Sequence, residues 1–154
     1  MITSFGLLAL RLCVGVLLIH HGYEKLADID NFADAFVRPL HLPFPITLSY
    51  TAAFSEILGS WCLITGVGVR SGALAILATM SVAIYHAISI NGFNIYLLEL
   101  LGLYWGGAFC LLTNGGGKFS IDYLIVKNYG YLIGAAERHQ ESSSLLPATS
   151  RINS

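Results

Sequence analysis

Charged side chains are scarce in this chain: Asp, Glu, Lys and Arg make up 11% of its 154 residues, against about 25% in an average soluble domain. Hydrophobic residues make up 55%, and the mean hydropathy is +0.69. A soluble fold of this length could not bury so much apolar surface. The basic residues are scattered and the net charge is −1, so the chain has no electrostatic footprint for nucleic acid. We therefore expect a membrane protein that has no nucleic-acid partner.

Several chemical motifs are also missing. The chain has three cysteines, Cys13, Cys62 and Cys110, with no C-x-x-C among them, so we expect buried, inert thiols in apolar surroundings rather than a redox relay. No Glu-x-x-His is present, which argues against a di-metal carboxylate site, and no metal is expected. The run at 115–118 lacks the spacing of a phosphate loop. No motif predicts catalysis by this chain alone, and whether it is an enzyme stays open.

Long apolar stretches fill about half of the chain. Each is roughly long enough to cross a bilayer as one helix, because about twenty residues span the hydrocarbon layer. Nearly all Pro, Asn and Asp residues lie between the stretches. The sequence therefore predicts an all-α fold, a bundle of four transmembrane helices. These helices are expected at Phe5–Tyr23, Ile46–Val67, Ser71–Ile90 and Ile95–Thr113.

The basic residues predict the orientation of this multi-pass protein. With four spans, one side holds six basic residues and the other only Lys25 and Arg38. The positive-inside rule places both termini on the cytoplasmic or an equivalent side. Plasma membrane and thylakoid stay equally open. The six residues on the terminal side are Arg11, Arg70, Lys118, Lys127, Arg138 and Arg151.

The connection after the first stretch has a pattern of its own. Apolar residues recur at helical spacing between Ile29 and Leu40, with Asp and Asn between them. This pattern predicts an amphipathic helix that lies at the membrane interface and ends at the prolines from Pro39 onward. Ser71 is expected to cap the third stretch.

The C-terminal part is expected to differ from the rest. Ile121–Gly134 is apolar but is interrupted by Lys127 and Asn128, which favours an interfacial or docked helix over a fifth span. From Glu137 onward the chain is polar and Ser-rich, as expected of a mobile tail. We predict a membrane domain at 1–122, and an interfacial helix with a polar tail at 123–154.

Ionisable side chains inside the spans are the functional candidates, because they are costly in lipid. Glu56 falls at the middle of the second stretch, where it must be protonated or paired with Arg11, a histidine or a ligand. Residues near helix ends can instead reach the headgroups. All four stretches place a His or Glu toward the side opposite the termini. These residues are His20, His21, Glu24, Glu56, His86 and Glu99.

Helical spacing predicts which faces point inward. The expected inner stripe of the second stretch is Ser49, Ala53, Glu56 and Ser60; that of the third is Gly72, Ala75, Thr79, Ala83 and His86; that of the fourth is Glu99, Gly102, Gly106 and Cys110. Tyr104 and Trp105 lie mid-span, where their polar atoms need partners, so we expect a neighbouring membrane protein or a cofactor to supply them.

These features together resemble a known family. Leu10-Arg11, His21-Gly22-Tyr23-Glu24-Lys25-Leu26, Leu42-Pro43-Phe44-Pro45, Glu56 before Gly66, and Gly117-Lys118-Phe119-Ser120-Ile121-Asp122 occur in the order seen in the DoxX family. The resemblance runs from about Leu7 to Asp122. It implies a compact four-helix membrane fold, and Arg11, His21, Lys25 and Glu56 look like the polar positions of the family.

The resemblance favours a redox-associated role without fixing a reaction, since some relatives are quinone-linked subunits and others are membrane partners in redox-stress assemblies. Two hypotheses follow: an integral membrane subunit of a larger complex with a structural or ligand-holding role, or a quinone-interacting oxidoreductase subunit. Quinone is the first cofactor candidate, with haem or a magnesium-centred pigment as alternatives, and the expected partners are the lipid bilayer and other integral membrane proteins. The candidate contacts are Glu56, His21, His86, Arg11 and Glu99.

Overall fold

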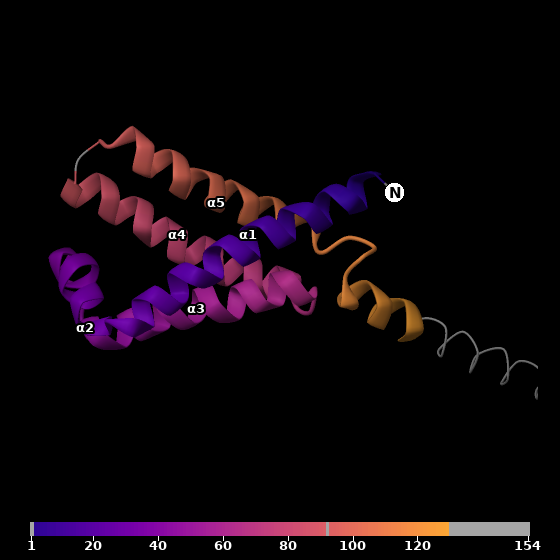
Figure 1. Cartoon of the computed structure of the whole chain (residues 1–154), viewed down its shortest axis with the longest axis horizontal. Helices are drawn as coiled ribbons and strands as arrows, with labels where there is room; N and C mark the ends of the chain where they lie inside the picture. The colour runs from indigo at the N-terminus through magenta and orange to yellow at the C-terminus, as the bar shows by residue number, and fades with distance from the viewer. Residues whose placement is uncertain (1, 92, 130–154) are drawn as a thin grey trace, which may run out of the picture.

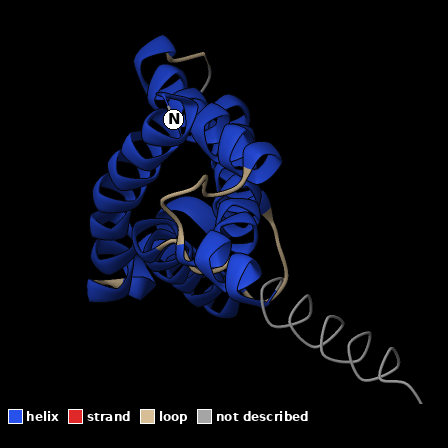
Figure 2. Cartoon of the chain, turned by 90° about the vertical axis from the view of Figure 1, so that its right-hand side faces the viewer, coloured by secondary structure: helices blue, strands red, loops and turns tan. Residues whose placement is uncertain are grey.

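The computed structural model describes residues 2–91 and 93–129. Within these ranges the chain forms helices and no strand (Figure 2), so the prediction of an all-α fold is confirmed. Four helices are long, and each contains one of the predicted apolar stretches apart from a residue or two at its end. They are α1 (Ile2–Ala27), α3 (Pro45–Thr65), α4 (Val69–Asn91) and α5 (Ile95–Asn114).

The four long helices run alternately in opposite directions (Figure 1). The connections enforce this, since only Gly66, Val67 and Gly68 separate α3 from α4. Gly66 and Gly68 both have positive φ, 79° and 63°, which a glycine adopts without steric cost. Helix α1 packs on α3, α3 on α4, and α4 on α5, with a smaller contact between α1 and α5.

A helical segment joins α1 to α3, as the amphipathic pattern predicts. It consists of α2 (Ile29–Phe32), a π-helical turn η1 (Ala33–Val37) and a 3₁₀ turn η2 (Arg38–Leu40). Asp28 caps its start by accepting a hydrogen bond from the Asn31 N–H. Ala33 and Val37 are buried whereas Asp34 is exposed, so the segment is amphipathic. Its position at the membrane interface stays a prediction.

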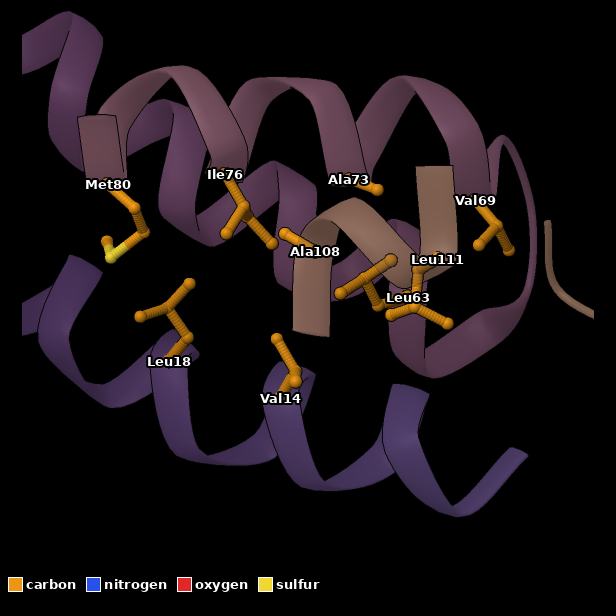
Figure 3. Packing of buried hydrophobic residues seen from close by; sticks show 9 residues of the cluster. All are labelled: Val14, Leu18, Leu63, Val69, Ala73, Ile76, Met80, Ala108 and Leu111. Carbon is orange, nitrogen blue, oxygen red and sulfur yellow. The ribbon is translucent and has the colours of Figure 1, made fainter. Parts of the chain in front are cut away.

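The hydrophobic core lies between the four long helices. Val14 and Leu18 from α1 point toward Leu63 of α3, four residues of α4, and Ala108 and Leu111 of α5 (Figure 3). Close approach of α1 to α3 requires glycine at Gly15 and Gly22, where an added Cβ would lie 2.8 and 2.6 Å from isoleucine side chains of α3. The α4 residues of this core are Val69, Ala73, Ile76 and Met80.

Three of the long helices are long and apolar enough to cross a membrane: Ile2–Ala27, Val69–Ile90 and Ile95–Asn114. Helix α3, although long enough, is not among the helices of the described ranges that are apolar enough to cross a membrane. It is rich in Ser and Thr and carries Glu56, which lowers its mean hydropathy. The predicted count of four transmembrane helices is therefore not confirmed.

The chain after α5 contacts the N-terminal half of α1 and the start of α4. Arg11, 2% exposed, donates hydrogen bonds from Nη1 to the Gly116 carbonyl (3.0 Å) and from Nη2 to the Phe119 carbonyl (3.3 Å). Asp122 accepts hydrogen bonds from the Gly68 and Val69 N–H groups at the start of α4. The expectation that Ser71 caps α4 is therefore wrong: α4 begins two residues earlier, and a remote carboxylate satisfies its first donors.

A further helix occupies 121–129 and projects away from the bundle (Figure 1). It agrees with the predicted start of an interfacial or docked helix, and its apolar side chains Leu124 and Val126 are exposed. Whether it lies on a membrane, and whether a domain boundary falls at 122, stay predictions. The predicted end of this helix and the polar tail lie outside the described residues.

Candidate functional site

One cavity of about 810 Å³ opens between the helices. Its walls come from the C-terminal half of α1, the N-terminal half of α3, the middle and C-terminal turns of α4 and the N-terminal half of α5, and residues of the α2–η2 segment also line it. Most of its lining is apolar, with a small number of polar side chains. Ligand sites in proteins have this size and this mixture of surfaces.

Glu56 lies in the wall of this cavity, completely buried. Its Oε1 atom is paired with Nζ of Lys25, which is 18% exposed. The hypothesis that Arg11 pairs with Glu56 is therefore wrong, because the Arg11 guanidinium bonds to carbonyls after α5. The second oxygen of Glu56, Oε2, has no hydrogen-bond partner within the described ranges. One half of the carboxylate is thus held by the protein and the other half can accept a hydrogen bond.

Lys25 lines the cavity, although it is not among the predicted site residues. The resemblance makes it a polar position of the family, and in the structure its side chain turns inward to Glu56. Its Nζ lies 5.2 Å from the ring centroid of Phe32, a cation–π contact. The signal that could have found it is its spacing from His21: four residues on one helix place both side chains on the same face.

Two histidines extend this polar group toward the surface. His21 Nδ1 lies 3.2 Å from Glu24 Oε2, and His20 Nε2 lies 2.9 Å from Glu24 Oε1. His21 and Glu24 line the cavity, whereas His20 is exposed. The His21 ring also meets Tyr104 of α5 edge to face, at 6.5 Å between centroids. A series of ionisable groups therefore leads from the cavity to the outside of the bundle.

His86 lies in the cavity wall on α4 and is 5% exposed. Its Nε2 atom makes no hydrogen bond to any residue that the structure describes. The ring lies 5.2 Å from the ring of Phe36, which stacks on Phe32 at 5.1 Å. The two phenylalanines thus form an aromatic wall that runs from Lys25 to His86.

The structure brings three of the five predicted site residues, Glu56, His21 and His86, around the cavity. Arg11 and Glu99 are not in its lining. Arg11 lies nearer the opposite end of the bundle, where it ties α1 to the segment after α5. Glu99 is exposed on α5, so its contact with a cofactor is not supported by this geometry.

The predicted inner stripes of α3 and α4 face inward in the structure, whereas the predicted stripe of α5 does not. All four residues of the α3 stripe are fully buried, and four of the five α4 stripe residues line the cavity. The α5 stripe is wrong: Gly102 and Gly106 are exposed, and an added Cβ at either would meet nothing within 4 Å. The inner face of α5 is offset by about one residue, because Ala108 and Leu111 bury more apolar surface than glycines do.

Trp105 and Cys13 also correct expectations. The Trp105 indole N–H donates to Ser81 Oγ of α4 at 3.0 Å, so it needs no external partner. Cys13 lies on the exposed surface of α1 rather than in a buried setting.

Among residues 2–91 and 93–129, no group of three or more His, Cys, Asp or Glu side chains is arranged to hold a metal ion.

Comparison with known proteins agrees with this architecture. The family model named DoxX matches residues 6–89, from α1 through most of α4. The chain belongs to the DoxX family. The match includes Lys25, Glu56 and His86 and ends before α5, whereas the resemblance noted from the sequence extends to Asp122.

One relative of this chain is an uncharacterized protein of Haemophilus influenzae, 34% identical over 137 residues that cover 82% of this chain and 87% of the relative. No solved structure matches the chain significantly. Family membership and the apolar helices identify an integral membrane protein.

Proposed function

We propose that the protein is an integral membrane subunit of a redox-associated complex, and that its cavity holds an aromatic, membrane-soluble ligand of the quinone class. The observation that carries this proposal is the Lys25–Glu56 pair inside a partly open, mainly apolar cavity. Burying a charge pair costs desolvation free energy, which the attraction between the charges repays only when the remaining polar atoms are also hydrogen-bonded. A pair kept at the wall of a cavity therefore favours a role in binding. A ligand that is apolar over most of its surface and polar at its ring matches both parts of the lining.

The aromatic wall supports the choice of a ring-shaped ligand. Phe32 and Phe36 stack on each other and line the cavity side by side. A flat ring can pack against such a surface by offset stacking, which adds about 1 kcal/mol to simple burial. A ligand with an isoprenoid tail can keep that tail in lipid where the cavity opens.

We place α3 as a fourth membrane span and both termini on the cytoplasmic or equivalent side. Helix α3 has 21 residues and runs antiparallel to both α1 and α4 (Figure 1). Three of its polar side chains support this placement: Ser49, Glu56 and Ser60 are fully buried, while the apolar Phe54, Leu58 and Trp61 are exposed. An inward polar face lets a helix of modest hydropathy cross lipid.

The outer face of α5 supports a partner among membrane proteins. Gly102 and Gly106 are exposed and separated by one helical turn, a spacing that permits close approach of another helix. Leu103 beside them is 75% exposed. Trp105, by contrast, no longer supports a partner because Ser81 satisfies it.

A quinone oxidoreductase role is the second candidate, and a specific observation favours it. His21, Glu24 and His20 connect the cavity to the exposed surface through two short contacts. Imidazole and carboxylate groups at these positions can exchange protons with a bound ring. The chain would then act as the quinone-binding part of an enzyme whose electron carrier belongs to a partner.

Binding of a short-chain para-benzoquinone to the protein in lipid nanodiscs tests the proposal, with empty nanodiscs as the blank. Ala83 lines the cavity, so Ala83→Phe fills it and should weaken binding about tenfold or more. Ala9 is exposed on α1, so Ala9→Phe adds the same bulk outside the cavity and should bind like the parent. Equal binding by the two variants would contradict the proposed site.

A further inference from the structure

We infer that the cavity recognises its ligand at two points, Glu56 Oε2 and His86 Nε2, and that it prefers a para-diphenol over the corresponding quinone. This inference rests on the proposed function and adds which redox form of the ring fits. Both atoms belong to side chains that are at least nine-tenths buried and that line one cavity. Neither atom has a hydrogen-bond partner in the part of the chain that the structure describes.

An orphaned buried polar atom is costly, and two in one cavity indicate a ligand that satisfies them. Leaving such a group unpaired costs about 1 to 3 kcal/mol, and more when the group is charged. The rest of each side chain is fixed: Lys25 holds Oε1 of Glu56, and the Phe36 ring packs on the His86 ring. Both free atoms are therefore preorganised for a bound molecule.

The spacing of the two residues sets the size of that molecule. Ser55, next to Glu56, bonds to Thr79 of α4 at 2.6 Å, so Glu56 and Thr79 lie at nearly the same level. His86 follows Thr79 by seven residues, which is roughly two helical turns and about 10 Å along the same face of α4. This value is an offset along the helix axis, and it leaves room for two hydrogen bonds of about 3 Å each with a gap of about one ring between them. One six-membered ring with para substituents spans about this gap.

The charge on Glu56 sets the chemistry at one end. An ionised carboxylate only accepts hydrogen bonds, and Oε1 is already paired with a lysine. The ligand atom that meets Oε2 must therefore carry a proton, as a phenolic hydroxyl does. A quinone carbonyl would place two acceptors against each other. A neutral imidazole can donate or accept through Nε2 according to its tautomer, so His86 binds either form.

Three ligands test this inference on the unmodified protein in nanodiscs, under anaerobic conditions: a short-chain para-benzoquinone, the quinol made by reducing it, and the dimethyl ether of that quinol. The ether keeps the ring and both oxygens, but a methyl group replaces each hydroxyl proton, so the ether cannot donate a hydrogen bond and cannot be oxidised in the same way. We expect the quinol to bind about tenfold more tightly than the quinone and the ether. Equal affinity for quinol and ether would overturn the inference.

Two variants and one control variant sharpen the test. In Glu56→Gln the amide oxygen keeps the Lys25 contact and turns the NH₂ group toward the ligand, so the preference should reverse in favour of the quinone. His86→Phe should weaken the binding of both redox forms about tenfold and leave the ratio of their affinities unchanged. Tyr85 is exposed and lies outside the cavity lining, so the Tyr85→Phe variant should bind like the parent.

If Glu56→Gln leaves the ratio unchanged, recognition by Oε2 is wrong. If none of the three ligands binds the parent, the proposed function fails as well; if all three bind equally, only this inference fails.

Discussion

Two buried ionisable residues, Glu56 and Arg11, have different tasks in this protein. Glu56 faces a cavity with one oxygen free. Arg11 faces backbone carbonyls, and Gly66 and Gly116 leave room for it, since an added Cβ at either would lie within 3.0 Å of Arg11 Nη1. We therefore interpret Glu56 as a binding residue and Arg11 as a residue that fixes the segment after α5.

Replacing Arg11 should destabilise the fold without altering the cavity. Arg11→Met leaves the Gly116 and Phe119 carbonyls unpaired and should cost roughly 2 to 3 kcal/mol of unfolding free energy. Arg70 makes one bond, to the Thr113 carbonyl, and is exposed, so Arg70→Met should cost under about 1 kcal/mol. Unfolding in detergent by circular dichroism measures both. Equal losses, or loss of ligand binding by folded Arg11→Met, would contradict this division of roles.

At the residue scale, the sequence predicts that Glu56, Arg11 and His86 are buried polar residues better than it predicts their partners. Glu56 stands out because a carboxylate inside an apolar stretch needs a partner. Its partner, Lys25, is distant in the chain, and only the packing of α1 on α3 brings the two together. Arg11 is a plausible partner by composition, but Gly116 and Phe119 lie more than a hundred residues away, and no local pattern relates them to it.

At the scale of elements, hydropathy predicts helices and leaves their ends and faces uncertain. Helix α1 extends beyond the predicted Phe5–Tyr23 at both ends, because His, Glu and Lys do not break a helix although they end the apolar run. The start of α4 depends on Asp122, a cap that no local pattern reveals. The inner face of α5 is missed because small residues fit a close contact or an exposed face equally well.

Helix α3 is the element whose placement most needs a test. In a background without Cys13, Cys62 and Cys110, Leu42→Cys and Val67→Cys place labels just before and just after α3, both at exposed positions. If α3 crosses the membrane, an impermeant maleimide added from one side labels only one of the two variants. Labelling of both from the same side would show that α3 does not span, and only three spans would remain.

At the scale of the whole molecule, the four long helices form a scaffold with two unlike ends. The end near the N-terminus and 121–129 is tied by Arg11 and Asp122 (Figure 1). The other end contains the cavity and the segment α2–η2, whose residues also line it. This division of the molecule is compatible with the proposed ligand-holding role, in which the tied end keeps the helices in register and the ligand occupies the other end.

The most direct test of the central claim, that this cavity holds an aromatic membrane-soluble ligand, is native mass spectrometry of the protein released gently from its own membrane. The account predicts that the chain carries one small aromatic molecule, in association with other membrane proteins, and that the Ala83→Phe variant has lost that molecule while Ala9→Phe retains it. A parent chain that carries no such molecule, or one that Ala83→Phe carries equally well, would contradict the account.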